Sequence, residues 1–322
     1  MLEGKNYKPI SYVYTYSYRD EEQSLCELEL RTLFDINNIN NDFRIIESPV
    51  KINPSRSPFL KERIDVIFEG NELQDIVQKV KQLKVGAYTY KVIYVKSGDF
   101  NQTKKISFTK RREIEREIGL HIDGEPNLIN PDRLFGILRI DERWVFGEYV
   151  KNDASWLRHQ KKPNSYSTAL STRVARSVVN IAVPNPVGIK AIDPCCGIGT
   201  VLVEALSMGI DIVGSDRNYL IIPGVKENLA YFGLEGEVTV RDMNKITEKY
   251  DVAIIDMPYN LCSVLPDADK LNMLRSARRF SSKLVVITIE EIDAILEEAG
   301  FTIIDRAVAK KGSFSRHVIV CE

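Results

Sequence analysis

From Gly188 to the end of the chain, short apolar segments alternate with segments in which apolar residues recur at helical spacing. We expect strands at residues 190–193, 210–215, 237–240, 252–256, 283–289, 301–308 and 317–321, with helices between the earlier strands. Such alternation is typical of an open, mostly parallel sheet that is covered by helices on both faces. We therefore predict an α/β fold for this half of the chain, with ligands bound at the carboxyl ends of the strands.

The first 150 residues lack this alternation, and their patterns predict a mixed α+β fold. Strands are expected at residues 9–18, 64–68, 88–95, 105–108 and 133–145, and helices at 21–34, 73–83 and 112–119. Residues 151–176 hold six Lys or Arg and one acidic residue, and they run into an expected helix at 167–182. We therefore divide the chain into an N-terminal α+β subdomain (1–60), a second α+β domain (61–150), a basic linker and helix (151–182) and the α/β domain (183–322).

Charge and cysteine content narrow the class of protein. The net charge of −1 excludes a uniformly basic nucleic-acid binder, so that any such role depends on local patches. The five cysteines are odd in number and show no Cys-x-x-Cys spacing, which argues against a disulfide framework or a zinc site. Neither a signal peptide nor an apolar run of membrane-spanning length is present. We expect a cytoplasmic protein without a bound metal or a membrane anchor.

The turn after the first α/β strand has the composition of a cofactor loop. Asp193 ends the strand, and the residues that follow it (DPCCGIGT) lead into a helix. Gly197 and Gly199 allow the backbone to approach a ligand closely and to adopt positive φ. A dinucleotide-binding loop would have a third glycine where Leu202 stands. A ligand with an ammonium group suits Asp193 better than a pyrophosphate does. The alternative is a tight turn that binds no ligand.

Two further acids follow the next strands in register. Asp216 ends the second strand, where an acid can accept hydrogen bonds from ribose hydroxyls. Asp242 follows the third strand, where a carboxylate could accept a hydrogen bond from an adenine amine. Each acid alone is more often a solvated residue at a strand end, but together they favour a nucleoside site. Cys195 and Cys196 are expected to line the loop as small side chains, without thiol chemistry.

The segment Asp256–Asn260 (DMPYN) follows the fourth strand and has the residues needed to hold a planar amine. The amine of a base is a poor nucleophile, because its lone pair is delocalised into the ring. The Asp256 carboxylate and the Met257 carbonyl could accept hydrogen bonds from its two N–H groups and favour a tetrahedral nitrogen. Correct positioning of the amine then supplies most of the remaining rate enhancement. Pro258 stiffens the loop, and Tyr259 offers a ring on which a flipped base can stack. The alternative is an ordinary loop with a core aromatic residue.

Basic residues that alternate with aromatic residues mark a candidate nucleic-acid surface. Between residues 81 and 112 there are nine Lys or Arg and one acidic residue. Phosphate contacts by such a patch supply affinity without base identity, although many basic runs are simply solvated. We expect contacts to phosphates from basic residues of this patch and of the linker: Lys104, Lys105, Lys110, Arg111, Arg112, Arg158, Lys161 and Lys162.

Residues from about 158 to 322 resemble the THUMP-associated branch of RNA amino-methyltransferases, which includes enzymes that modify guanine N2 in transfer RNA. The resemblance rests on Lys162-Pro163, the DPCCGIGT loop, Gly214-Ser215-Asp216 and Asp256-Met257-Pro258-Tyr259. In the first half, residues 113–119 (EIEREIG) with Asn130-Pro131-Asp132 resemble the end of a THUMP domain, a module similar to ones that grip the acceptor end of transfer RNA.

The resemblance implies a Rossmann-like class I methyltransferase sheet behind a THUMP-like RNA-binding region, with S-adenosylmethionine as cofactor. By motif position it implies that the target base is held by Asp256, Pro258 and Tyr259. It likewise implies that the cofactor is held by Asp193, Cys195, Gly197, Gly199, Asp216 and Asp242. We expect the partner to be a structured RNA, with transfer RNA as the first candidate, and we infer no obligate protein partner.

Two departures from the family pattern bear on the target. The family has proline where Met257 stands and glycine where Asn260 stands. Met257 keeps the carbonyl acceptor but loosens the turn, and Asn260 could narrow or repolarise the base pocket. The expected function is methylation of a guanosine N2 in tRNA. Two alternatives stay open: adenine N6 methylation of RNA, and a non-catalytic RNA-binding protein with a vestigial methyltransferase fold.

Overall fold

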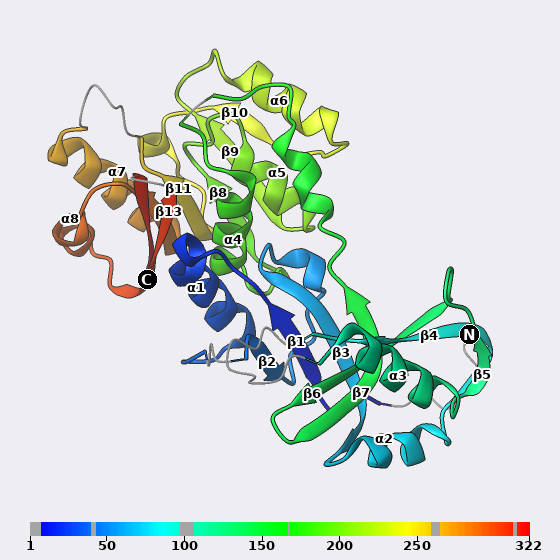
Figure 1. Cartoon of the computed structure of the whole chain (residues 1–322). Helices are drawn as coiled ribbons and strands as arrows, with labels where there is room; N and C mark the ends of the chain where they lie inside the picture. The colour runs from blue at the N-terminus through cyan, green and yellow to red at the C-terminus, as the bar shows by residue number, and fades with distance from the viewer. Residues whose placement is uncertain (1–7, 40–42, 97–105, 167, 259–264, 312–313) are drawn as a thin grey trace. The chain divides into compact units, whose positions relative to one another are not determined.

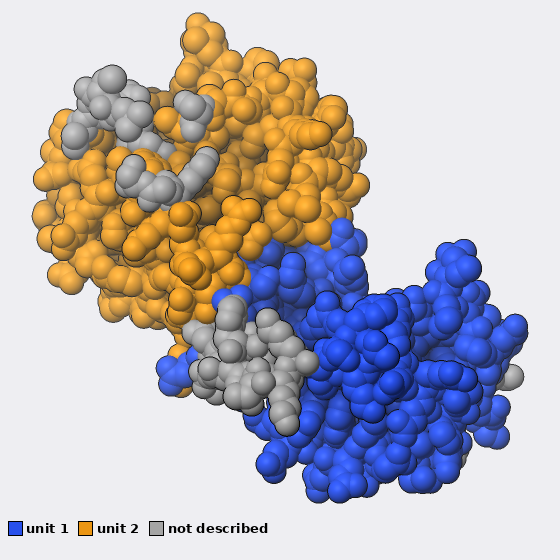
Figure 2. Space-filling view, in the orientation of Figure 1, with its two compact units in different colours: residues 1–17, 38–153 blue, residues 18–37, 154–322 orange. Residues whose placement is uncertain are grey.

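A computed structural model describes residues 8–39, 43–96, 106–166, 168–258, 265–311 and 314–322. The chain forms two compact units, which Figure 2 colours separately. Unit 1 comprises residues 1–17 and 38–153, and unit 2 comprises residues 18–37 and 154–322. The division expected at residue 60 does not coincide with this one, because strands on both sides of residue 60 belong to a single sheet.

Unit 1 is built on a seven-stranded sheet with the strand order β2-β1-β3-β7-β6-β4-β5. The strands, in that order, are Ile45–Ser48, Tyr12–Tyr16, Leu60–Gly70, Arg143–Lys151, Arg133–Ile140, Lys84–Tyr94 and Asp123–Pro126. Helix α2 (Leu73–Val80) packs on β3 and β7, and helix α3 (Phe108–Gly119) packs on β4 (Figure 1). The core between sheet and helices contains Ile76, Ile118, Phe135, Ile137 and Phe146. The predicted α+β character of this region is confirmed.

Two expected strands in unit 1 were wrong in detail. Of the strand expected at 105–108, the described residues 106–108 form instead the entry to α3, where the Ser107 side chain accepts a hydrogen bond from the Lys110 N–H at 3.2 Å. A serine N-cap therefore decides the local structure, although the apolar spacing suggested a strand. The single strand expected at 133–145 is two antiparallel strands, β6 and β7, joined by a turn in which Asp141 has φ +50°.

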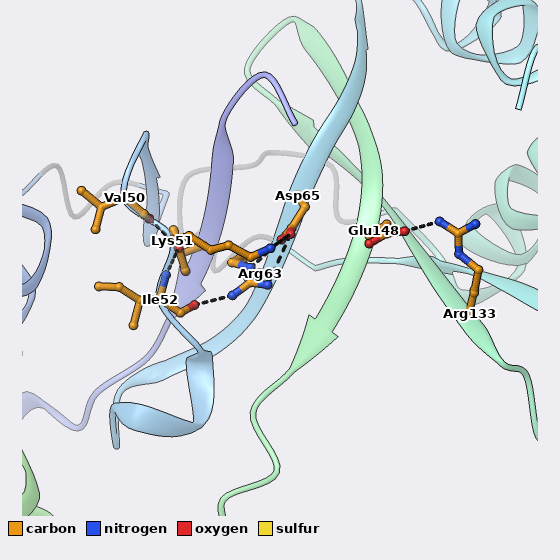
Figure 3. A network of polar contacts seen from close by, with 8 residues as sticks. Val50, Lys51, Ile52, Arg63, Asp65, Arg133 and Glu148 are labelled. Carbon is orange, nitrogen blue, oxygen red and sulfur yellow. Dashed lines mark hydrogen bonds and ion pairs between the residues drawn. The ribbon is translucent and has the colours of Figure 1, made fainter. Parts of the chain in front are cut away.

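A buried ion pair fixes one edge of the unit 1 sheet (Figure 3). Arg63 and Asp65 both lie on β3 and pair with each other, and Arg63 Nη1 also donates to the Ile52 carbonyl at 2.6 Å. Lys51 Nζ reaches Asp65 Oδ2 at 3.0 Å. These contacts attach the segment after β2 to β3, since leaving either buried charge without a partner would be costly.

Unit 2 is built on a second seven-stranded sheet with the strand order β10-β9-β8-β11-β12-β14-β13. The strands, in that order, are Val238–Val240, Asp211–Asp216, Lys190–Asp193, Tyr250–Asp256, Ser281–Thr288, Phe314–Cys321 and Ile303–Lys311. The first five are parallel, and β14 runs antiparallel to both β12 and β13. The predicted open, mostly parallel sheet is confirmed. Chain order reverses beside β8, and this switch point is where such sheets bind ligands.

Helices from two distant parts of the sequence cover this sheet. They are α4 (Thr172–Ala182), α5 (Thr200–Ser207), α6 (Ile222–Tyr231), α7 (Asp267–Phe280), α8 (Asp293–Glu298) and, from the N-terminal region, α1 (Gln23–Phe34). Helix α1 packs on α4 and β13 (Figure 1). Its Arg31 pairs with Asp305 at 3.0 Å, and its buried Glu29 accepts a hydrogen bond from Asn180 Nδ2 at 2.6 Å. Within the described ranges, none of the helices has both the length and the apolar content that crossing a membrane requires.

Candidate active site

A cavity of about 750 Å³ opens at the carboxyl ends of the unit 2 strands. Its volume lies in the range usual for small-ligand sites. Asp193, Asp216 and Asp256 are the last residues of β8, β9 and β11, and Asp242 follows β10 by two residues. The predicted site residues that line the cavity are Asp193, Cys195, Gly197, Asp216, Asp242, Asp256 and Pro258. Parallel pairing thus gathers side chains that are more than 60 residues apart in the sequence.

The two glycines of the loop differ in what they do. Gly197 has φ +52° and lines the cavity, and a Cβ atom there would lie 2.4 Å from the Tyr166 hydroxyl oxygen. Gly199 has φ +77° and is the N-cap of α5, where a Cβ atom would lie 2.7 Å from Val225 Cγ1. It is not among the cavity-lining residues. Gly197 therefore shapes the cavity wall, and Gly199 turns the chain into helix α5.

Backbone hydrogen bonds orient two of the cavity's acids. Asp216 accepts from the Gly197 N–H at 3.1 Å with one carboxylate oxygen and from the Asn218 N–H at 2.9 Å with the other. Asp242 Oδ1 accepts from the Asn244 N–H at 2.9 Å. Each carboxylate oxygen has a second lone pair, so that both groups can still accept hydrogen bonds from a ligand.

The Asp193 carboxyl group is buried, so that its ionised form is costly in free energy. It is only 3% exposed and accepts a hydrogen bond from the Cys195 N–H at 3.3 Å. Burial, and to a lesser extent the charges of Asp256 and Asp216, hold its pKa well above the usual range. A cationic ligand would lower the pKa of Asp193, because a positive charge among the three carboxylates would stabilise their ionised forms.

Asp256 carries an unsatisfied polar atom at the cavity. Its Oδ1 is buried and, among the described residues, makes no hydrogen bond. Burial raises the pKa of Asp256 to about 7, against the opposing effect of the Arg316 charge. The next residue, Met257, is fixed because its N–H donates to the Ile287 carbonyl of β12 at 2.9 Å. A buried acceptor without a partner is rare in proteins and often marks a functional site. Tyr259 and Asn260 lie outside the described residues.

The segment before α4 supplies cavity residues that the sequence analysis missed. Tyr166, Thr168 and Leu170 all line the cavity. The Tyr166 side chain is 47% exposed, but its hydroxyl faces Gly197. Burial of that group, followed by the charges of Asp256, Asp216 and Asp193, raises the pKa of Tyr166 to about 12. These residues precede the Ser171 cap of α4, and the large side chains of Tyr166 and Leu170 within a basic stretch were the available signal. The sequence analysis placed Tyr166 in the basic linker, and Thr168 and Leu170 in the helix expected at 167–182, whereas the helix begins at Thr172.

Side-chain contacts attach this segment to α5. Lys162 Nζ donates to Thr200 Oγ1 at 2.6 Å, and burial lowers the pKa of Lys162. His159 Nδ1 and Arg176 Nη1 lie 2.8 and 2.7 Å from the carboxylate of Glu204, which is fully buried. The partly buried Lys162 therefore contacts the first residue of α5, and its expected contact with phosphate stays a prediction.

The other predicted phosphate contacts are divided between the two units. Arg158 and Lys161 are exposed residues of unit 2. Lys110 and Arg112 are exposed on α3 of unit 1 and pair with Glu113 at 3.0 Å and Glu115 at 2.7 Å, which reduces their free charge. Arg111, also on α3, is partly buried. Two more of the predicted residues lie outside the described ones, namely Lys104 and Lys105.

Parts of the chain are similar to known methyltransferases. Residues 159–263, which contain both the glycine loop and the Asp256 loop, match the RMKL-like methyltransferase domain family UPF0020. A tRNA (guanine(10)-N2)-dimethyltransferase from Methanothermobacter thermautotrophicus is 26% identical over 264 residues, which are 75% of this chain and 76% of that protein. The enzyme of the same name from Pyrococcus abyssi is 27% identical over 275 residues, 79% of this chain and 80% of that protein.

Among solved structures, TrmN from Thermus thermophilus aligns with a TM-score of 0.49 and 18% identity, over 97% of this chain and 99% of that chain. The strand order of unit 2, with its single antiparallel strand β14 inserted between β12 and β13, agrees with the open, mostly parallel sheet that the sequence predicts.

Proposed function

We infer that this chain, a member of the family of RNA amino-methyltransferases that modify guanine N2, transfers a methyl group from S-adenosylmethionine to the exocyclic N2 of a guanosine in tRNA. Relatives with this activity match three quarters or more of both chains. The observation that carries the proposal is the buried Asp256 Oδ1, which lacks a partner among the described residues and borders a cavity lined by three further acids. An amine N–H would satisfy that atom.

The chemistry of the cavity fits S-adenosylmethionine. Asp193 offers a carboxylate to the positively charged methionine end, beside the backbone of Gly197. Asp216, held by two backbone N–H groups, would accept hydrogen bonds from the ribose hydroxyls. Asp242 would accept one from the adenine amine. The cofactor supplies an electrophilic methyl group on its sulfonium. The Cys195 side chain, which lies 3.8 Å from Met243 Sδ, would pack against the ligand.

The residues of the reacting loop would make the amine nucleophilic by orienting it. The ionised Asp256 carboxylate would accept a hydrogen bond from one N–H of the amine, and the Met257 carbonyl would accept one from the other. Together they would orient the nitrogen lone pair for methyl transfer. Pro258 and Tyr259 would hold the plane of the flipped base. Since the transfer is a direct displacement, the contribution of these residues is mainly correct placement.

The N-terminal unit would bind the RNA. We propose that unit 1 is a THUMP-like module that selects tRNA by its shape, with Arg111, Arg112 and neighbouring basic residues contacting phosphates. Arg158 and Lys161 would extend the phosphate contacts onto unit 2.

The proposed role of Asp256 gives a pH dependence. The ionised carboxylate accepts a hydrogen bond from the amine N–H more strongly than the neutral acid does, and burial raises the pKa of this group to about 7. We therefore expect kcat/KM for S-adenosylmethionine to rise with pH through an inflection near that value and to level off above it, because kcat/KM reports groups of the free protein. Initial rates at limiting cofactor between about pH 5.5 and 8.5 would record the profile. A flat profile over this range would contradict the assignment of Asp256.

The reaction and its target can be identified in one experiment. The protein is incubated with methyl-labelled S-adenosylmethionine and unmodified tRNA, and the RNA is digested to nucleosides. We expect the label in N2-methylated guanosine. Label in N6-methyladenosine would contradict the guanine assignment. Absence of label, together with no cofactor binding by calorimetry up to about millimolar concentrations, would favour a non-catalytic RNA-binding protein.

A further inference from the structure

Arg316 on β14 lies beside the reacting site without lining its cavity. Its Nη2 donates to the Thr168 carbonyl at 3.0 Å, and its guanidinium lies 4.8 Å from the centre of the Phe314 ring. Thr168 itself lines the cavity. One cation therefore connects the last hairpin of the sheet to the segment before α4 that forms part of the cavity wall.

Strand register places Arg316 at the same edge of the sheet as Asp256. Asp256 on β11 pairs with Ile287 on β12, and the next β12 residue, Thr288, pairs with His317 on β14. Arg316 precedes His317 and so lies just beyond the level at which β11 ends.

We propose that Arg316 is a positioning residue for methyl transfer, which holds Thr168 in the cavity wall and places a positive charge beside the Asp256 carboxylate. The inference rests on the proposed function for the role of Asp256 in catalysis. The contact with Thr168 and the electrostatic effect on Asp256 do not depend on it.

The charge matters because the surroundings of Asp256 otherwise oppose its ionisation. Burial raises its pKa, and Arg316 lowers it. Among the described residues, the carboxylate of Asp256 also affects the pKa of Asp193 on β8, of Cys195 in the following loop and of Tyr166 before α4. None of these three carries a positive charge. A fixed cation beside the carboxylate therefore keeps more of Asp256 ionised near neutral pH.

A carboxylate titration in the free protein tests the electrostatic part without any reaction. The protein is labelled with ¹³C at aspartate carboxyl carbons, and the Asp256 signal is identified by its loss in Asp256→Asn. We expect a wild-type midpoint near 7. In both charge-free variants, Arg316→Gln and Arg316→Met, the midpoint should rise by roughly one pH unit. Arg316→Lys, which keeps the charge, should stay closer to the wild type.

Arg278 provides a matched control in the same unit. It also donates to a backbone carbonyl, that of Ser282 at 3.2 Å, and lies 5.4 Å from the centre of a phenylalanine ring, Phe301. It is not among the cavity residues. Arg278→Gln should leave the Asp256 midpoint and the affinity for S-adenosylmethionine unchanged, whereas Arg316→Gln should weaken that affinity several-fold in calorimetry, because the Thr168 wall loses its support.

The outcomes separate this inference from the proposed function. An unmoved Asp256 midpoint in a folded charge-free variant would overturn the electrostatic role of Arg316. Equal cofactor affinities of Arg316→Gln and Arg278→Gln would overturn its role at Thr168. If the wild type methylates no RNA but the midpoint moves as expected, the proposed function fails and the effect of Arg316 on Asp256 stands. If the wild type is active and Arg316→Gln keeps its pH–rate inflection, the positioning role in catalysis fails.

Discussion

Replacing Asp256 with alanine is expected to lower kcat for RNA methylation by a factor of about 10²–10³ and to leave the Kd for RNA nearly unchanged. The carboxylate borders the cavity with a buried oxygen that has no hydrogen-bond partner among the described residues, so that its loss removes an acceptor that only the reacting amine would use. Single-turnover methylation and filter binding with the same tRNA would measure the two quantities. Parallel loss of RNA affinity would contradict the assigned role.

The same substitution should stabilise the fold at neutral and higher pH. Because burial raises the folded-state pKa of Asp256 to about 7, this carboxyl destabilises the protein. The penalty is absent below the unfolded pKa, grows as pH rises toward 7, and is full above it. We expect a gain of roughly 1–3 kcal/mol for Asp256→Ala at pH 8. Urea unfolding of the variant at pH 8 and at low pH would test this sign.

Asp251 is the matched control for both measurements. It lies at the opposite end of β11, is exposed, and accepts a hydrogen bond from the Lys190 N–H at 2.7 Å. Asp251→Ala should keep full activity and should not stabilise the protein, since its carboxylate is solvated and hydrogen-bonded. A stabilised Asp251→Ala variant would show that the gain at Asp256 does not come from relieving burial.

Replacing Glu204 with alanine is expected to destabilise the protein by about 3–5 kcal/mol, because it leaves a buried arginine without the carboxylate that faces it. Glu204 is fully buried, and Arg176 is 5% exposed and lies 2.7 Å from it. For a domain of this size we expect a decrease in Tm of roughly 10 °C. Cofactor affinity should also fall, since Glu204 lies on α5, the helix that begins at the end of the glycine loop.

The exposed ion pair Arg275–Glu298 is the control that distinguishes the effect of burial on stability from the effect of charge pairing. Its atoms lie 3.1 Å apart, and both side chains are more than half exposed, at 57% and 61%. Glu298→Ala should therefore cost less than about 1 kcal/mol. Replacing Arg176 and Glu204 together with apolar residues of similar volume should recover much of the lost stability. Equal losses in Glu204→Ala and Glu298→Ala, measured by denaturant unfolding, would contradict this account.

The alternation of strands and helices predicts the unit 2 sheet. Each parallel strand is buried on both faces and is followed by a crossover helix, and both requirements can be recognised in the local sequence as an apolar run and a helical pattern. The same local rules place Asp193, Asp216 and Asp256 at strand ends. Where prediction was wrong, a local cap or turn outweighed the apolar spacing, as at Ser107 before α3 and Asp141 between β6 and β7.

The sequence by itself determined the fold class of both halves and the acids around the cofactor loop, because periodicity and motif order are local properties. Only the tertiary structure decided that α1 packs in unit 2, that Tyr166 faces Gly197, and that Lys162 binds Thr200. It also decided the buried contacts of Glu204 and the place of Arg316 near Asp256. These features depend on contacts between residues that are distant in the chain and on which charged groups are buried next to one another. A local sequence pattern contains neither kind of information.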